Sequence, residues 1–390
     1  MEINTEHEDL CMSKKTFTVV VHVLNNSSSF TGEPCYLACG ANNWQADGHC
    51  IGVIPPKGKR VSGVLHDVEE GELEFKITRG SWDTLSSSVK GELLGPYRID
   101  VREDMEMEIH VDAWRDEFPS STASPQVQVL ADKFYFPNLD THRRIWIYLP
   151  KDYSYSNQHY PVLYMHDGQH LFDEATSLGR TGPVEWKVDE TIDAANRQAI
   201  VIGIEHPAEI VDRAREFLLF PFGEVMEPAG HLYLHDIVEV LKPYVDRHYR
   251  TLSDKKHTGM VGSSFGGLLT LYAGALHANV FGTLGVFSPS IWTGKRELED
   301  FFAEKLRENA CLLCGQCYYF YAGGREKRKN APEGLGDMRA DMLDFIDAHK
   351  KAMCVKIMID IDEEGKHGAL YWQKAFTRFY ERWQQEISDN

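Results

Sequence analysis

The chain has 390 residues, and 43% of them are hydrophobic, a content typical of a globular domain protein rather than a disordered chain. It carries 41 basic and 59 acidic residues, a net charge of −18, which argues against nucleic acid or an anionic membrane as a partner. The length is too great for one small core and predicts two domains.

The first nine residues are acidic and lack the basic-then-apolar layout of a secretory signal. No apolar stretch approaches the roughly 20 residues that a membrane-spanning helix needs. We therefore expect a cytoplasmic protein, or a secreted one if a signal has been removed. The eight cysteines are expected to be reduced thiols, since Cys35, Cys39 and Cys50 could pair only after export.

Short runs of alternating character dominate residues 1–120, separated by glycine, proline and asparagine. The runs are Thr16–Val23, Cys35–Cys39, Gly71–Thr78, Tyr97–Val101 and Met105–Val111. Alternation with a period of two predicts half-buried strands, and this number of short strands predicts a small Ig-like β-sandwich.

A small polar stretch from Pro119 to Pro125 reads as a linker, which we assign to residues 121–126. In residues 127–390, strand-like runs alternate with helical ones. This order predicts an α/β domain with a mostly parallel sheet covered by helices on both faces.

The most informative stretch is Gly262-Ser263-Ser264-Phe265-Gly266, between the apolar run that ends at Val261 and a helix-like run from Gly267. A serine flanked by glycines at a strand-to-helix junction is typical of a nucleophile elbow, in which the glycines let strand and helix approach closely. The alternative is a glycine-serine turn without chemistry. We predict that Ser264 is a nucleophile.

A serine nucleophile needs a histidine held by a carboxylate, and in α/β-hydrolases these follow in the order Ser, Asp or Glu, His. His277 and His349 lie in helical runs and are expected at the surface, whereas His367 lies in a loop after an apolar strand. Glu326 follows the strand Tyr318–Ala322 and a glycine turn, at the ligand-binding edge of a parallel sheet. Asp337, Asp341, Asp360 and Asp362 compete for the acid role, with a solvated surface charge as the default for each.

An oxyanion hole requires two backbone N–H groups. One is expected from Phe265, the residue after the nucleophile, and the other from Gly168 or Gln169, in the loop after the strand Pro161–Met165. An ordinary turn at Asp167-Gly168 is the alternative.

Cys311, Cys314 and Cys317 have metal-like spacing, but no cysteine or histidine cluster follows them, and Cys317 begins a strand-like run. We expect packing roles for these thiols, no metal site, and no cofactor.

These motifs together resemble the esterase D-like α/β-hydrolases, a family that includes siderophore (enterochelin) esterases, feruloyl and acetyl-xylan esterases and mycolyltransferases. The resemblance covers roughly Gln126 to Trp383. It rests on Val162–Gly168, Val201–Ile204 with Arg213–Phe217, Gly262–Gly267, Phe287–Trp292, Gly323–Glu326, and His367 with Trp372. It implies that Ser264 is the nucleophile, Glu326 the acid and His367 the base. The His166-Asp167-Gly168 loop departs from the His-Gly pair of many members, which leaves the second oxyanion donor least determined.

Residues 1–120 resemble starch-binding and glycogen-binding modules at Ala41–Trp44 and Glu74–Trp82. Exposed tryptophans offer flat faces on which sugar rings stack, so Trp44 and Trp82 are candidates for a sugar platform. Alternatively, both tryptophans fill the sandwich core, or the module shapes the catalytic cleft.

The resemblance implies a serine carboxylic-ester hydrolase that acts through an acyl-enzyme. Its expected partner is a small-molecule or glycan-linked ester: a siderophore-type or aryl (feruloyl) ester, or alternatively acetyl-xylan or another carbohydrate ester. Arg215, Trp292 and Trp372 are candidate substrate contacts, and Arg213 and Arg325 could also meet an anionic group. A contrasting hypothesis is a catalytically inactive glycan-binding or scaffold protein. The sequence leaves the oligomeric state open.

Overall fold

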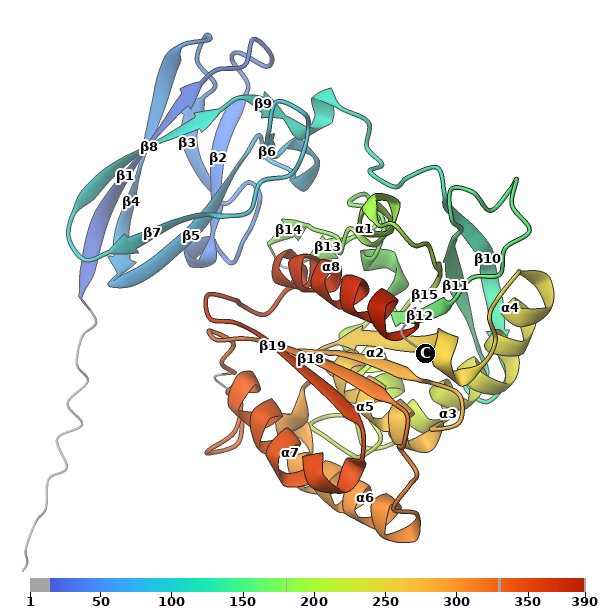
Figure 1. Ribbon diagram of the computed structural model, residues 1–390. Helices are drawn as coiled ribbons and strands as arrows, with labels where there is room; N and C mark the ends of the chain where they lie inside the picture. Colours follow the sequence, from blue (N-terminus) through green and yellow to red (C-terminus); the bar gives the residue numbers. More distant parts are fainter. Residues whose placement is uncertain (1–14, 180, 329–330, 389–390) are drawn as a thin grey trace, which may run out of the picture. The chain divides into compact units, whose positions relative to one another are not determined.

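The computed structural model describes residues 15–179, 181–328 and 331–388. The chain divides into two compact units (Figure 1). The first comprises Met1–Ser121 together with the short segment Leu178–Pro183, and the second comprises Thr122–Ser177 and Val184–Asn390.

The first unit is a β-sandwich. One sheet has the order β4 (Lys59–Glu69), β1 (Thr16–Asn25), β8 (Met105–Val111), and the other has the order β3 (His49–Val53), β2 (Pro34–Cys39), β5 (Gly71–Thr78), β7 (Tyr97–Val101). Two further two-stranded ladders pair β6 (Ser86–Ser87) with β9 (Ala113–Trp114) and β13 (Leu178–Gly179) with β14 (Gly182–Pro183). Alternate side chains from both sheets, including Val19, Leu37 and Phe75, form one apolar core. The predicted β-sandwich is therefore confirmed.

Sequence reasoning missed the strands β3 and β4. In β4 only Gly63 and Leu65 are buried, because one face of the strand is solvated along its length. Polar residues therefore outnumber apolar ones in this strand, and the alternation that reveals the neighbouring strands is too weak to detect here.

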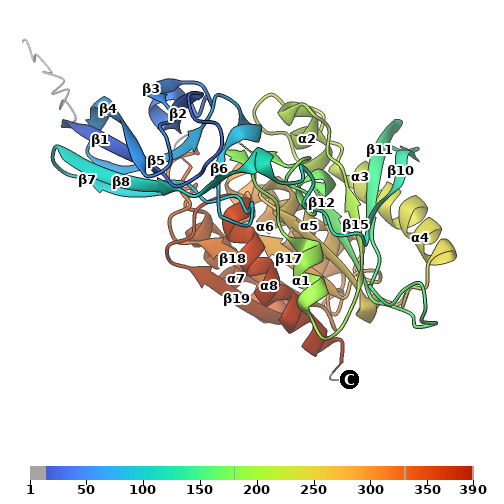
Figure 2. The ribbon, with the colours of Figure 1, turned by 90° about the horizontal axis from the view of Figure 1, so that it is seen from above.

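The second unit is built on an eight-stranded sheet (Figures 1 and 2). The strand order is β10 (Val127–Phe136), β11 (Thr141–Tyr148), β15 (Ile200–Ile204), β12 (Val162–His166), β16 (Thr258–Ser263), β17 (Thr283–Phe287), β18 (Cys317–Gly323) and β19 (Lys356–Asp362). The six strands β15, β12, β16, β17, β18 and β19 each pair in parallel with their neighbours in this group. β11 pairs antiparallel with both β10 and β15, so β10 and β11 form an antiparallel edge. This is the mostly parallel sheet that the sequence predicts.

Helices cover both faces of the sheet. They are α1 (Val188–Ala194), α2 (Ile210–Phe217), α3 (Gly230–Asp236), α4 (Lys242–His248), α5 (Phe265–Leu276), α6 (Lys295–Glu308), α7 (Met338–Met353) and α8 (Ala369–Glu386), and a π-helical segment, Ile237–Leu241, joins α3 to α4. Strand side chains alternate between the faces: Tyr164 and Phe320 pack with α2 to α7, whereas Met165 and Tyr321 pack with α1 and α8. The central strands are therefore apolar on both faces.

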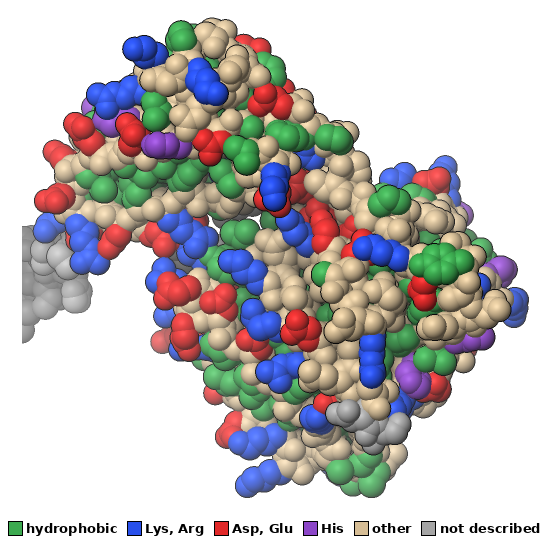
Figure 3. All heavy atoms as spheres, turned by 45° about the horizontal axis from the view of Figure 1, so that its top comes forward, with side chains coloured by type: hydrophobic (Ala, Val, Ile, Leu, Met, Phe, Trp, Pro, Cys, Tyr) green, Lys and Arg blue, Asp and Glu red, His purple; other side chains and the backbone are tan. Residues whose placement is uncertain are grey.

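Basic and acidic side chains are interspersed over the face shown in Figure 3. None of the helices within residues 15–179, 181–328 and 331–388 combines the length and apolar character needed to cross a bilayer.

Candidate active site

The carboxyl ends of the parallel strands meet at one edge of the sheet, where ligands bind in open α/β folds. Asp167 follows β12, Ser264 follows β16, Ser288 follows β17, Glu326 follows β18 and His367 follows β19. The tertiary structure thus gathers side chains that are up to 200 residues apart in the sequence.

Ser264 occupies a sharp turn between β16 and α5. Its backbone has φ 58° and ψ −119°, a conformation that non-glycine residues rarely adopt. A Cβ atom at Gly262 would lie 2.5 Å from the backbone oxygen of Gly266, and one at Gly267 would lie 2.6 Å from that of Phe287, so the tight turn requires these glycines. The Ser264 hydroxyl lies 3.1 Å from Ser290 Oγ.

Glu326 and His367 form a hydrogen-bonded pair. His367 Nδ1 donates to Glu326 Oε2 at 2.7 Å, and the Glu326 side chain is fully buried. Burial lowers the pKa of His367 below 6.5, although the hydrogen bond and charge of Glu326 oppose this shift. The imidazole is thus a neutral base at neutral pH, with Nε2 as its acceptor.

Ser288 and Trp372 support this pair, and sequence reasoning gave Ser288 no role. Ser288 Oγ donates to Glu326 Oε1 at 2.7 Å and accepts a hydrogen bond from Trp372 Nε1 at 3.0 Å. The backbone N–H of Gly323 also donates to Glu326 Oε1. The Trp372 ring meets the His367 ring edge-on, with centroids 4.9 Å apart. Trp372, which was expected to contact substrate, is hydrogen-bonded to Ser288, and Ser288 in turn donates to Glu326.

The predicted oxyanion donors lie at the ends of their elements. Phe265 is the first residue of α5, where a backbone N–H has no intrahelical partner. Gly168 and Gln169 lie in a 3₁₀ turn directly after β12. A Cβ atom at Gly168 would lie 2.6 Å from the carbonyl carbon of Gly203 in β15, so only glycine permits this close approach.

A buried ion pair, which sequence reasoning did not predict, holds this turn. Arg213 Nε and Nη2 donate to the two carboxylate oxygens of Asp167 at 2.7 and 2.8 Å, and both side chains are about one-tenth exposed. Burial would raise the pKa of Asp167, but Arg213, with smaller contributions from His206 and His170, holds it well below 3.8. The arginine and the His166-Asp167-Gly168 loop were each noted in the sequence, but nothing there indicated that they meet.

The other candidate substrate residues differ in placement. Arg215 is exposed on α2, on the side opposite the buried Arg213, and Arg325 is paired with Glu364. Trp292 is half-buried and lines a cavity of about 410 Å³.

The expected tryptophan platform in the first unit is not formed by two open rings. Trp44 is only 8% exposed, which contradicts the expectation of an exposed ring at this position. Trp82 is half-buried, and a Cβ atom at Gly182, in the same unit, would lie 2.7 Å from its ring. Sequence alternation does not reveal this burial, because both tryptophans lie outside the strands: Trp44 follows a 3₁₀ turn and Trp82 begins another.

Two expectations of surface positions are wrong. His349 is 8% exposed because it lies on the same face of α7 as Met342, Phe345 and Met353, and it stacks on Phe345. Asp341 is 2% exposed and accepts a hydrogen bond from the backbone N–H of Gly336. His277 is half-buried at the carboxyl end of α5.

Cys317 begins β18 as predicted, with a buried side chain. In the described part of the chain, the side chains of Glu185, Asp189 and Glu190 bring three potential metal ligands within 4.8 Å of one another. This group contains no cysteine.

Comparisons with known proteins show what this chain is similar to. Residues 137–328 match the family model named Esterase. Two proteins of Bacillus subtilis (strain 168) are related in sequence. YjcH is 26% identical over 251 residues, 63% of this chain and 92% of YjcH, and YbbA is 27% identical over 157 residues, 39% of this chain and 58% of YbbA. The chain therefore spans less than two thirds of YbbA.

Two solved structures share the fold. The enterobactin esterase FES of Shigella flexneri, crystallised with enterobactin, superposes with a TM-score of 0.52 at 18% identity, over 92% of this chain and 89% of FES. The siderophore hydrolase EstB of Aspergillus nidulans has a TM-score of 0.52 at 19% identity, over 67% of this chain and 97% of EstB. The match to FES extends beyond the second unit, and the predicted α/β-hydrolase fold is confirmed.

Proposed function

We propose that this chain is an ester hydrolase and that Ser264, His367 and Glu326 are its catalytic triad; the match of residues 137–328 to the Esterase family model supports the activity. The observation that carries this proposal is the 2.7 Å hydrogen bond between His367 Nδ1 and the buried Glu326, at the same sheet edge as the strained turn of Ser264. Strain of this kind is typical of functional sites.

In the proposed reaction, His367 Nε2 takes the proton of Ser264 Oγ as this oxygen attacks the ester carbonyl. The N–H groups of Phe265 and of Gly168 or Gln169 stabilise the oxyanion of the tetrahedral intermediate. His367 then protonates the departing alcohol, which leaves an acyl group on Ser264. Water, deprotonated by His367, hydrolyses the acyl-enzyme and releases the acid.

We propose an aromatic acyl or alcohol group in the substrate, as in siderophore-type or feruloyl esters. The cavity of about 410 Å³ is lined by Phe222 and Trp292, whose rings meet edge-to-face at 5.3 Å. Trp292 follows Ser290, whose hydroxyl contacts that of Ser264. The indole Nε1 of Trp292 is buried without a hydrogen-bond partner, so it can donate to a phenolic oxygen. FES is named as an enterobactin esterase and EstB as a siderophore hydrolase, which supports a siderophore-type ester as one candidate substrate.

A fluorophosphonate probe tests the triad. We expect labelling of the wild-type protein and none of Ser264→Ala, with Ser263→Ala as the control because it precedes the elbow position. A wild-type protein that is not labelled would support the inactive scaffold hypothesis.

A substrate panel of feruloyl, triscatecholate and acetyl-xylan esters tests the substrate class. We expect Trp292→Phe to lower kcat/KM on phenolic esters by about tenfold through loss of one hydrogen bond, and to leave acetyl esters unchanged. Preference for acetyl-xylan by the wild-type protein would replace the aromatic ester with a carbohydrate ester.

A further inference from the structure

Three carboxylates gather around the start of α1, in the second unit. Glu185 precedes the helix, and Asp189 and Glu190 lie in its first turn. Each side chain offers an oxygen, and these oxygens all lie within 4.8 Å of one another. The affinity of helix N-termini for acidic residues accounts for Asp189 and Glu190, but it does not account for Glu185.

Two of these side chains are buried, and one of them, Glu185, has an oxygen without a hydrogen-bond partner. Glu185 is 1% exposed and Asp189 is 0% exposed. One oxygen of each is bound: Thr122 Oγ1 donates to Glu185 Oε1 at 2.7 Å, and the backbone N–H of Ser124 donates to Asp189 Oδ2 at 2.7 Å. Glu185 Oε2 is buried without a hydrogen-bond partner, while the Asp189 carboxylate lies within hydrogen-bonding reach of the side chains of Ser124 and Glu190.

Unpaired carboxylate oxygens in a buried site are costly unless a positive charge compensates them. A cation bound next to Glu185 Oε2 would supply this compensation.

We propose that Glu185, Asp189 and Glu190 bind a divalent cation of the calcium type, with Ser124 Oγ as a further ligand. Hard cations prefer carboxylate and hydroxyl oxygens. Ca²⁺ binds oxygens at about 2.3–2.6 Å, so ligands on opposite sides of the ion lie up to about 5.2 Å apart, and oxygens within 4.8 Å of one another fit around one such ion.

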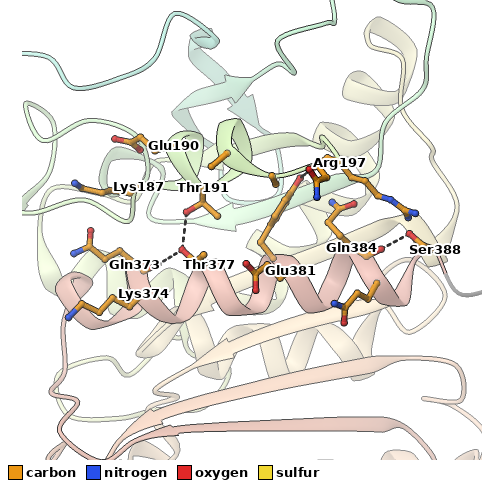
Figure 4. Close-up of a pocket in the computed structure, with 15 residues that line it drawn as sticks. Lys187, Glu190, Thr191, Arg197, Gln373, Lys374, Thr377, Glu381, Gln384 and Ser388 are labelled. Carbon is orange, nitrogen blue, oxygen red and sulfur yellow. Dashed lines mark hydrogen bonds between the residues drawn. The ribbon is translucent and has the colours of Figure 1, made fainter.

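The site lies at a groove. Glu190 lines a groove of about 890 Å³ between α1 and α8, together with Lys187, Thr191 and Thr377 (Figure 4). In Figure 4 Glu190 lies at the same end of the groove as Lys187, and Thr191 and Thr377 bridge the two helices with a hydrogen bond of 3.2 Å. The cluster therefore adjoins solvent at Glu190.

Binding would join three segments: residues 122–124, Glu185 and α1. Trp186 follows Glu185, and its ring lies 5.7 Å from that of Trp372, which donates to Ser288 beside Glu326. The cation would thus stabilise the packing of Trp186 on Trp372, next to the proposed catalytic acid Glu326, without contacting the reacting atoms. Its role is structural.

Terbium luminescence tests the proposal on the full chain, because Tb³⁺ replaces Ca²⁺ at oxygen sites and Trp186 is close enough to sensitise it. We expect a sensitised Tb³⁺ signal that Ca²⁺ displaces, together with a rise in Tm on adding Ca²⁺ to the chelator-treated protein. Glu185→Gln and Asp189→Asn should each weaken binding by at least about tenfold, since each removes a charged ligand. Glu381→Gln, at an acidic residue that lines the same groove on α8, should bind as the wild type does.

Circular dichroism establishes that each variant is folded. If one variant fails to fold, the wild-type titration and the other variant still show whether these carboxylates bind the cation. Absence of a Ca²⁺-displaceable signal and of a Ca²⁺-dependent Tm in the wild-type protein would overturn the proposal. A Tb³⁺ signal and a Ca²⁺-dependent Tm that persist unchanged in Glu185→Gln and Asp189→Asn would also overturn the proposal.

Discussion

The ion pair between Asp167 and Arg213 offers the sharpest test of how the loop with the proposed oxyanion donors Gly168 and Gln169 is held. Asp167→Asn keeps the side-chain shape, and asparagine tolerates the φ of 60° found at this position. The change removes the charge that compensates Arg213, whose guanidinium lies over the ring of Phe217 and is one-tenth exposed.

Breaking a buried pair by removing one partner costs about 3–5 kcal/mol, because the remaining charge stays buried without compensation. The amide oxygen of the introduced asparagine can still accept one of the two hydrogen bonds that Asp167 accepts, so we expect about 3 kcal/mol for Asp167→Asn. In the double variant Asp167→Asn with Arg213→Met neither charge remains. It should therefore lose clearly less stability than the sum of the two single variants.

Urea unfolding measures the stability, and hydrolysis of a p-nitrophenyl ester measures the activity. Because Asp167 directly precedes Gly168 and Gln169, a displacement of this turn by about 1 Å should lower kcat about 100-fold. Asp347→Asn is the matched control: Asp347 forms an exposed pair with Lys350, and its loss should cost less than about 1 kcal/mol. A cost below about 1 kcal/mol for Asp167→Asn, or strictly additive single variants, would refute this account of the ion pair.

Three further predictions concern the triad. Ser264→Ala and His367→Ala should each lower kcat by several orders of magnitude, and the double variant should lose little more, because the groups act as one unit; near-normal turnover of a p-nitrophenyl ester by Ser264→Ala would remove the assignment. Burial lowers the pKa of His367 below 6.5, so the base stays neutral at pH 6.5, and kcat/KM should fall on acidification with a midpoint below that value; a midpoint above 6.5 in the pH profile would contradict this. Turnover measured well below the unfolding temperature should survive EDTA, because the serine, the histidine and backbone donors supply the charge stabilisation; loss of activity with recovery on adding zinc would point instead to a catalytic metal.

The sequence by itself determined the elements whose local pattern is strong. The apolar run before Gly262 and the small residues after it predict β16, α5 and the turn between them, because the close approach of strand and helix leaves only glycine at fixed positions. In the first unit, β5, β7 and β8 have the bounds that the sequence predicts, and the side chains of β7 and β8 alternate in exposure as the pattern requires. The assignment of Ser264, Glu326 and His367 as a triad also starts from the chain alone, and it stays a proposal.

Only the tertiary structure decided which charged and polar groups meet. Asp167 and Arg213 are 46 residues apart, and Ser288 and Trp372 are 84 residues apart, so no local periodicity links the members of either pair. The burial of His349 and Asp341 depends on how α7 packs, and the burial of Trp44 depends on the path of a loop. Similarly, nothing in the local sequence marks Glu185 and Asp189 as buried, because their burial depends on residues 122–124 folding back over the start of α1. Contacts between distant segments are set by the topology of the sheet, which places the ends of its parallel strands together whatever their separation along the chain.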